Sequence, residues 1–185
     1  MIYADPPWRY QDRKCKGACE KHYPTMPIKE ICGLPVPKIT DKDSVLFLWV
    51  TYPMLREGMQ VIKSWGFQYK TIAFQWIKTY PKQTDKYVLG LGRWTRGNTE
   101  CCLLGVHGKP KRKRKDISQL VIAPLTRHSQ KPLIVRDKIK LLMGDDIPSI
   151  ELFARSPAYG WHCWGNEVEQ EEGSNDNGTM ETKSK

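Results

Sequence analysis

The feature that most constrains the fold of this chain is an uninterrupted apolar run at residues 45–50, which reads Val-Leu-Phe-Leu-Trp-Val. A strand with one face in solvent alternates apolar and polar residues, so a continuous run indicates a strand that is covered on both faces. Such strands occur in sheets with helices packed on either side. Other apolar runs lie at residues 2–4, 101–106, 120–123 and 150–153, and residues 69–77 are rich in aromatic and β-branched residues.

Two segments between these runs have the periodicity of amphipathic helices. In residues 53–65 the apolar face is predicted to carry Leu55, Met59 and Ile62, and a glycine follows the last turn. Residues 132–143 repeat this pattern with Val135, Ile139 and Leu142, and residues 27–32 are predicted to form a shorter helix. The alternation of strands and helices predicts an α/β fold with a mostly parallel sheet, whose ligands bind at the carboxyl ends of the strands.

Length and composition predict a single domain over residues 1–169, followed by a disordered polar tail at residues 170–185. Residues 12–21 are expected to form a mobile loop, and residues 80–96 a long loop of the kind that carries function. The sequence shows no signal peptide and no apolar stretch of the roughly 20 residues needed to span a membrane. We therefore expect a cytoplasmic protein that does not associate with membranes.

The positive charge of the chain is concentrated in one segment. The net charge is +10, and residues 109–115, Lys-Pro-Lys-Arg-Lys-Arg-Lys, carry six of these charges, which leaves 10 − 6 = 4 for the rest. A run of this kind is exposed, and two interpretations remain open. It is either a solvated loop or a loop that binds the phosphates of nucleic acid.

The six cysteines are expected to be reduced thiols, because nothing in the sequence indicates export. Cys15, Cys19 and His22 have the residue types of zinc ligands. Their spacing is cramped and no second pair of ligands stands nearby, so we predict no metal site.

The clearest chemical motif is Asp5-Pro6-Pro7-Trp8, which follows the first strand directly. It suits a reaction at a weakly nucleophilic amino group, such as the exocyclic nitrogen of adenine. The Asp5 carboxylate and the Pro6 carbonyl are hydrogen-bond acceptors that would return electron density to that nitrogen, and the prolines stiffen the backbone. Trp8 is predicted to offer a flat face on which the base stacks.

In these residues the chain resembles the DPPW family of N6-adenine methyltransferases, which includes the catalytic subunit of the eukaryotic mRNA adenosine methyltransferase and small bacterial and phage enzymes. The resemblance covers about residues 2–169 and is nearer to the compact bacterial and phage members. It implies a Rossmann-like methyltransferase fold in the permuted, β-class order, with the catalytic motif first and the cofactor strand last. It also implies S-adenosylmethionine as the cofactor and assigns Asp5, Pro6, Pro7 and Trp8 to catalysis.

The same resemblance implies a set of cofactor-binding residues. Lys131, in the family's Ser-x-Lys-Pro segment, would pair with the carboxylate of the cofactor, although an ordinary solvated lysine is the alternative. Asn166 and Glu167 would contact its ribose. The full set is Ala4, Asp5, His128, Lys131, Glu151, Leu152, Phe153, Arg155, Asn166 and Glu167. Relatives often have glycine where this chain has Ala154, which leaves open whether the backbone comes close there.

The implied substrate is adenine in DNA, most simply a double strand from which the base is flipped. RNA adenosine methylation and a non-catalytic nucleic-acid-binding subunit are the alternatives, and a homodimer or heterodimer is compatible with each. The expected setting is a bacterial or phage-infected cell. The residues predicted to contact nucleic acid are Tyr23, Lys78, Arg93, Arg96, Lys111, Arg112, Lys113 and Arg114.

Overall fold

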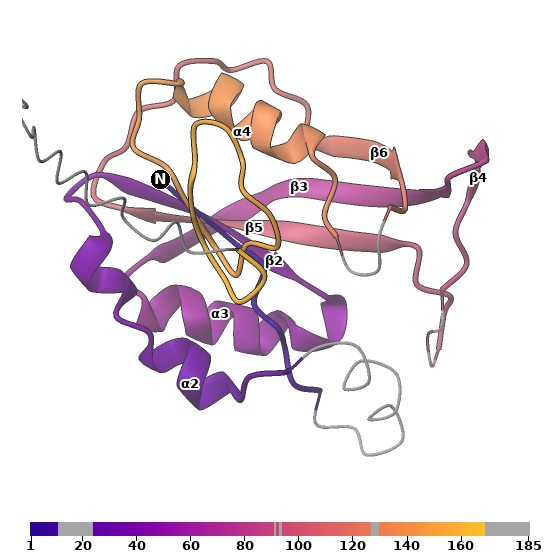
Figure 1. Cartoon of the computed structure of the whole chain (residues 1–185), viewed down its shortest axis with the longest axis horizontal. Coiled ribbons are helices and arrows are strands. Elements are labelled where there is room, and N and C mark those ends of the chain that lie inside the picture. The colour runs from indigo at the N-terminus through magenta and orange to yellow at the C-terminus, as the bar shows by residue number, and fades with distance from the viewer. Residues whose placement is uncertain (11–23, 91, 93, 127–129, 169–185) are drawn as a thin grey trace, which may run out of the picture.

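A computed structural model describes residues 1–10, 24–90, 92, 94–126 and 130–168 of the chain. Within this part, one mixed sheet of eight strands carries helices on both of its faces (Figure 1). The predicted loop at residues 12–21 and the predicted tail at 170–185 lie outside the described residues. No helix in the described part is long and apolar enough to cross a membrane.

The predicted strands and helices are present, with bounds that differ by a few residues. The strands are β1 (Ile2–Ala4), β2 (Ser44–Val50), β3 (Gln68–Tyr80), β4 (Gln83–Tyr87), β5 (Thr99–His107), β6 (Leu120–Pro124), β7 (Ile150–Leu152) and β8 (His162–Trp164). The helices are α2 (Ile28–Gly33), α3 (Leu55–Ser64) and α4 (Ile134–Met143), with 3-10 turns at Val36–Ile39 and Tyr52–Met54. The short strand β8 was not predicted, because its three residues include exposed side chains and show no apolar run.

The sheet has the order β4-β3-β5-β2-β1-β7-β8, and β6 pairs with β3. Strands β2, β1, β7 and β8 are parallel to one another, whereas β5 is antiparallel to both of its neighbours, β2 and β3. Strand β6 runs parallel to β3 and β4 antiparallel to it. Six of the eight described strands therefore point the same way, which confirms the predicted α/β fold and adds a central antiparallel strand.

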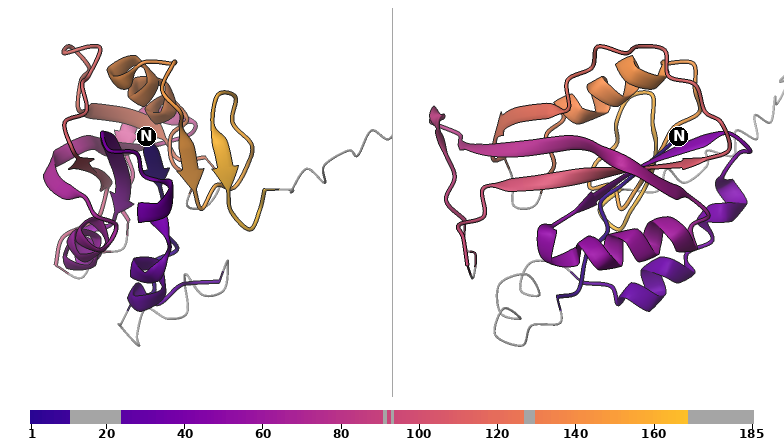
Figure 2. Two further views of the ribbon diagram at one scale, coloured as in Figure 1. Left: turned by 90° about the vertical axis from the view of Figure 1, so that its left-hand side faces the viewer. Right: turned by 180° about the vertical axis from the view of Figure 1, so that it is seen from behind.

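Strand β2 is buried along its whole length, as its apolar run predicts. Leu46 and Leu48 pack with Trp65 of the segment that follows α3, on the face covered by α2 and α3. Phe47 and Trp49 pack on the opposite face, which α4 covers (Figure 2). Because successive strand residues point to opposite faces, one run of apolar residues supplies both halves of the core.

Two details of the sequence prediction are wrong. The buried face of α3 is formed by Gly58, Val61 and Ile62, and Met59 is exposed. Gly58 decides this, because a Cβ built there would lie 3.1 Å from the Val50 side chain, so the helix packs most closely at the glycine. The segment 80–96 is also not a loop throughout, since it contains β4, which extends the β3 hairpin beyond the body of the sheet (Figure 1).

After β7 the backbone adopts an unusual conformation and two segments pack closely together. Phe153 has a φ of 63°, a left-handed conformation that is unusual for a bulky residue. The next residue, Ala154, donates its N–H to the Trp164 carbonyl at 2.9 Å. Gly165 then crosses so closely that a Cβ on it would lie 2.0 Å from the Ala154 carbonyl oxygen. The chain therefore does have a close backbone approach at Ala154, and the glycine that permits it lies on the other segment.

We expect Gly165→Ala to lower the free energy of unfolding by at least about 1–3 kcal/mol, because the added methyl group overlaps backbone that cannot rotate away. The matched control is Gly33→Ala at the end of α2, where no atom lies within 4 Å of a built Cβ. This control should be neutral or slightly stabilising, since alanine is favoured over glycine in a helix. Urea unfolding measures both, and equal effects of the two substitutions would contradict the close approach.

Candidate active site

The carboxyl ends of several strands meet at one edge of the sheet, and charged residues gather there. Asp5 follows β1, and Lys78 lies near the end of β3. Glu100 lies at the beginning of β5, and it reaches the same edge because β5 runs antiparallel, with Cys101 paired to Val50 at the end of β2. Lys131 lies between β6 and α4. The fold thus brings four residues together from four distant parts of the sequence.

These four side chains form an alternating chain of charges. Lys131 Nζ donates to Asp5 Oδ2 at 2.7 Å and lies 3.4 Å from Glu100 Oε2. Glu100 also accepts a hydrogen bond from Lys78. The Lys131 side chain is 11% exposed, and its ammonium group lies 5.6 Å from the centre of the buried Trp49 ring. A largely buried cation with two carboxylates is well compensated, and removing one partner would leave a costly unpaired charge.

Burial and neighbouring charges act in opposite directions on this group. Burial raises the pKa of Asp5, and the ammonium group of Lys131 opposes that rise without cancelling it. The pKa of Lys131 lies above its ordinary value because Asp5 and Glu100 outweigh the effect of its burial. The pKa of Glu100 is lowered, because the two lysines outweigh its burial. Lys131 therefore favours the ionised form of both carboxylates at this edge.

The Asp5-Pro6-Pro7-Trp8 motif lies at this edge, and hydrogen bonds hold its backbone in place. The Pro6 carbonyl accepts a hydrogen bond from the Trp8 N–H at 2.8 Å, and the Pro7 carbonyl accepts one from the Met26 N–H at 2.8 Å. Trp8 is 6% exposed, and its indole N–H donates to the Trp49 carbonyl at 3.1 Å. This placement does not support the predicted stacking of a base on Trp8. The ring packs in the core and anchors the motif there.

The predicted cofactor strand also ends at this edge. Ala4 and Leu152 are buried and paired in register between β1 and β7. Glu151 accepts two hydrogen bonds from Arg136 of α4, at 2.6 and 2.8 Å. Burial raises the pKa of Glu151, although Arg136 opposes this. A bidentate pair of this kind fixes the orientation of the carboxylate.

Five of the predicted cofactor residues line one pocket. Its lining includes Asp5, Lys131, Glu151, Phe153 and Arg155, which are all residues predicted from the sequence. Arg155 lies 3.7 Å from Glu167, and Asn166 is exposed beside it. The structure therefore brings most of the predicted set together. His128 lies outside the described residues.

The residues predicted to bind nucleic acid do not form one surface. Lys78 is partly buried and pairs with Glu100, so it belongs to the group of four charged side chains at the site. Arg96 is exposed near the hairpin of β3 and β4. The basic residues 111–114 lie at the other end of the molecule, beside the last turn of α4. Tyr23 and Arg93 lie outside the described residues, as do Cys15, Cys19 and His22, and the described residues hold no cluster that could bind a metal ion.

Two residues of the site were missed in the sequence. Glu100 precedes an apolar strand, and its importance depends on the direction of that strand, which the sequence does not state. Arg136 lies five residues after Lys131 and was grouped with the helix. A basic residue in the first turn of a helix interacts unfavourably with the helix dipole. This position could have indicated that Arg136 has a carboxylate partner.

The sequence pattern of the MT-A70 family matches residues 1–167, which include every residue of the site described above. The chain belongs to the MT-A70 family. Its relatives include the Type II methyltransferase M.MunI of Mycoplasma sp, which is 37% identical over 91% of this chain and 77% of that protein. The N(6)-adenosine-methyltransferase MT-A70-like protein of Arabidopsis thaliana is 29% identical, and the human N(6)-adenosine-methyltransferase catalytic subunit METTL3 is 28% identical.

The MT-A70 match extends over nearly all of the described chain, but the relatives differ greatly in length. This chain spans 23% of the Arabidopsis protein and 28% of the human one, each over 91% of its own residues. The family match spans the Asp5-Pro6-Pro7-Trp8 motif, the four charged side chains and strand β7 described above. The chain is thus a member of a methyltransferase family, with a Rossmann-like fold.

We expect Lys131→Met to raise the pKa of Asp5, because burial would then act on the carboxylate without the opposing ammonium group. Carbon-13 NMR titration of the aspartate carboxyl groups measures this without any substrate. Lys63→Met in α3 changes the same residue type at an exposed position away from the site and should leave Asp5 unchanged. An unaltered Asp5 pKa in the Lys131 variant would contradict the proposed coupling.

Proposed function

We propose that this protein transfers a methyl group from S-adenosylmethionine to the N6 amino group of adenine in DNA. The observation that carries the proposal is the position of Asp5, which follows β1 at the carboxyl edge of the sheet and bonds to Lys131 at 2.7 Å. Membership of the MT-A70 family supports the reaction class. The relative with the higher identity and coverage, a Type II methyltransferase, supports DNA as the substrate.

The chemistry assigned to Asp5 is hydrogen-bond acceptance. The lone pair of the adenine amino group is delocalised into the ring, and an acceptor placed on its N–H returns electron density to the nitrogen. Lys131 holds Oδ2 of Asp5 and favours its ionised form, which is the stronger acceptor. The Pro6 carbonyl is the proposed second acceptor. It already accepts the Trp8 N–H, and a carbonyl oxygen has two lone pairs.

The donor set of the pocket fits the proposed cofactor, which carries an ammonium group, a carboxylate and a ribose. Cationic Lys131 and Arg155 lie on the same pocket as anionic Asp5 and Glu151. We assign Lys131 and Arg155 to the carboxylate, and Asn166 and Glu167 to the ribose hydroxyl groups. The strained backbone at Phe153 is typical of a functional site. When bound, S-adenosylmethionine would supply the electrophilic methyl group, and these residues would align it with the amino nitrogen.

The hairpin of β3 and β4 is the proposed surface for the bases near the target. It begins at Lys78 beside the site and extends past the edge of the sheet (Figure 1). Tyr80 and Tyr87 are exposed along it, and Trp94, farther along, is 100% exposed. Aromatic faces with neighbouring cations such as Arg96 suit stacking against unpaired bases and contact with phosphates. This hairpin takes over the stacking role that the sequence had suggested for Trp8.

Two alternative functions have different support. RNA adenosine methylation is favoured by the relatives named as N(6)-adenosine-methyltransferases, whose identity to this chain is lower. A non-catalytic nucleic-acid-binding subunit is disfavoured by the intact Asp5-Pro6-Pro7-Trp8 motif and by the ion pair that holds its carboxylate.

We expect Asp5→Ala to lower the rate of methyl transfer by about a hundred- to a thousandfold, because it removes an acceptor aimed at the reacting group. The assay uses labelled S-adenosylmethionine with duplex DNA, single-stranded DNA or RNA, followed by nucleoside analysis. Asp145→Ala, at an exposed carboxylate after α4, is the matched control and should retain full activity. Near-normal turnover of Asp5→Ala would remove Asp5 from the mechanism. Labelled adenosine from RNA alone would replace DNA with RNA as the substrate.

We expect Lys131→Ala and Asn166→Ala to weaken S-adenosylmethionine binding, the first by about ten- to a hundredfold, since a charge-assisted hydrogen bond contributes roughly 1.5–3 kcal/mol. Asn166→Ala should have the smaller effect because its side chain is neutral and exposed. Isothermal titration calorimetry measures both, with Lys63→Ala as the control. Unchanged affinity in both variants would show that the cofactor binds elsewhere.

A further inference from the structure

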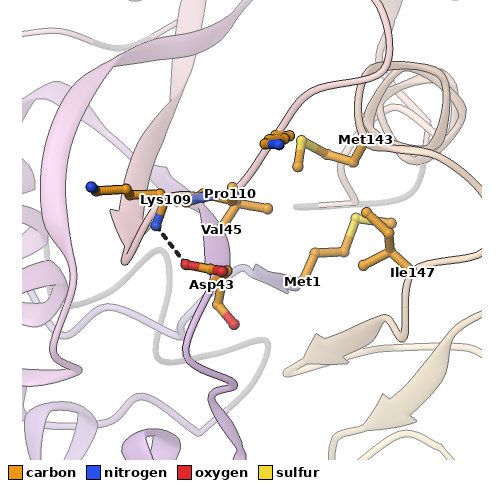
Figure 3. Close-up of a pocket in the computed structure, with 9 residues that line it drawn as sticks. Met1, Asp43, Val45, Lys109, Pro110, Met143 and Ile147 are labelled. Atoms are coloured by element: carbon orange, nitrogen blue, oxygen red, sulfur yellow. Dashed lines mark hydrogen bonds between the residues drawn. The ribbon is translucent and has the colours of Figure 1, made fainter.

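The basic segment, residues 109–115, is held against the body of the protein. The Lys109 N–H donates to Asp43 Oδ1 at 2.7 Å, just before β2 (Figure 3). The Lys113 N–H donates to the Leu142 carbonyl in the last turn of α4 at 2.8 Å. These are backbone donors, so the anchoring leaves the long basic side chains at the surface. All of residues 111–115 are exposed.

The place where the segment is anchored is the opposite end of the sheet from Asp5. Lys109 and Lys111 line a pocket of about 190 Å³ whose other walls include Met1, before β1, and Met143, at the end of α4. Lys131 and Asp5 lie at the other ends of the same helix and strand. The ten residues of α4 span about 15 Å, at 1.5 Å per residue. The seven residues of β2 span roughly 23 Å, at about 3.3 Å per residue. The basic segment therefore lies beyond the reach of a nucleotide bound at Asp5.

Most of the cations in the segment lack a compensating charge. Lys113 lies 3.4 Å from Asp146, and Arg114 pairs with Asp116. Among the described residues, no carboxylate forms an ion pair with Lys109, Lys111, Arg112 or Lys115. Figure 3 shows the Lys109 side chain directed away from Met1 and Ile147, so this cation does not serve to fill the pocket.

A purely structural role does not explain this arrangement. Cations near the end of a helix interact favourably with its dipole, but the effect falls off within the last turn and does not require six of them. Neighbouring like charges repel one another, and a polyanion relieves that repulsion. Phosphates suit this surface because the segment has no aromatic or amide side chain that could read a base edge.

We propose that the basic segment holds the phosphates of nucleic acid that flanks the target, as a second contact surface separate from the catalytic edge. The inference rests on the proposed function for the identity of the nucleic acid. A separation of about 15–23 Å corresponds to roughly four to seven base pairs, at 3.4 Å per pair. The affinity of the enzyme for its substrate then depends on the length of the duplex, and the contribution of the segment disappears on short duplexes.

The test compares a variant with Lys111→Ser, Arg112→Ser and Lys115→Ser against a control with Lys29→Ser, Lys63→Ser and Lys70→Ser. Both lose three exposed positive charges, and the control changes α2, α3 and β3 instead. The target sequence is first mapped by sequencing methylated plasmid DNA. Methyl transfer is then measured on duplexes with three or with twelve base pairs on each side of the target. Fluorescence anisotropy with a 30-base-pair duplex of mixed sequence gives the salt dependence of binding.

On the long duplex we expect the segment variant to raise KM about tenfold with little change in kcat, and on the short duplex to leave KM near the wild-type value. Its log–log salt slope on the 30-base-pair duplex should become shallower by about 2.7 units, or 0.9 for each of three lost contacts. A slope equal to that of the control variant would overturn the proposal, as would an equal rise in KM on both duplexes. A shallower slope without DNA methylation would refute the proposed function while retaining the second surface.

Discussion

The ion pairs of the Lys131 ammonium group with the carboxylates of Asp5 and Glu100 are the interactions on which the candidate site depends. Lys131, in the segment before α4, thereby contacts the residue after β1 and the beginning of β5. These three parts of the structure are far apart in the sequence. Without this cation, burial would act unopposed by Lys131 on both carboxyl groups and would favour their neutral forms. The same contact therefore connects these elements, favours the ionised form of Asp5 and orients its carboxylate.

The molecule separates two kinds of charge. At the candidate site, cations and anions alternate and compensate one another, from Lys78 through Glu100 and Lys131 to Asp5. At the opposite end, the basic segment presents cations that are mostly uncompensated within the described chain. Charges that are paired within the protein suit the precise positioning of small groups, whereas a surface of like charge suits an extended polyanion. The net charge alone does not distinguish these two roles.

The strained turn at Phe153 depends on a residue elsewhere in the chain. Gly165 allows β8 and the residues after it to lie against Ala154, and Trp164 packs its ring against Phe153 with 5.6 Å between centroids. Together these contacts compensate the unfavourable backbone conformation. The expectation from the sequence concerned Ala154, whereas the steric requirement falls on Gly165, which lies against it.

The sequence by itself determined the local features of this protein. The apolar run of β2, the helical period before Gly144 and the Asp5-Pro6-Pro7-Trp8 motif each depend on residues close together in the chain, so the fold class and the main catalytic candidate could be predicted. Only the tertiary structure decided which way β5 runs, and with it the place of Glu100 in the site. It also placed Trp8 in the core, Arg136 on Glu151, and the basic segment away from Asp5. These outcomes depend on strand order and on which helix face packs against the sheet, and both are set by contacts between residues far apart in the sequence.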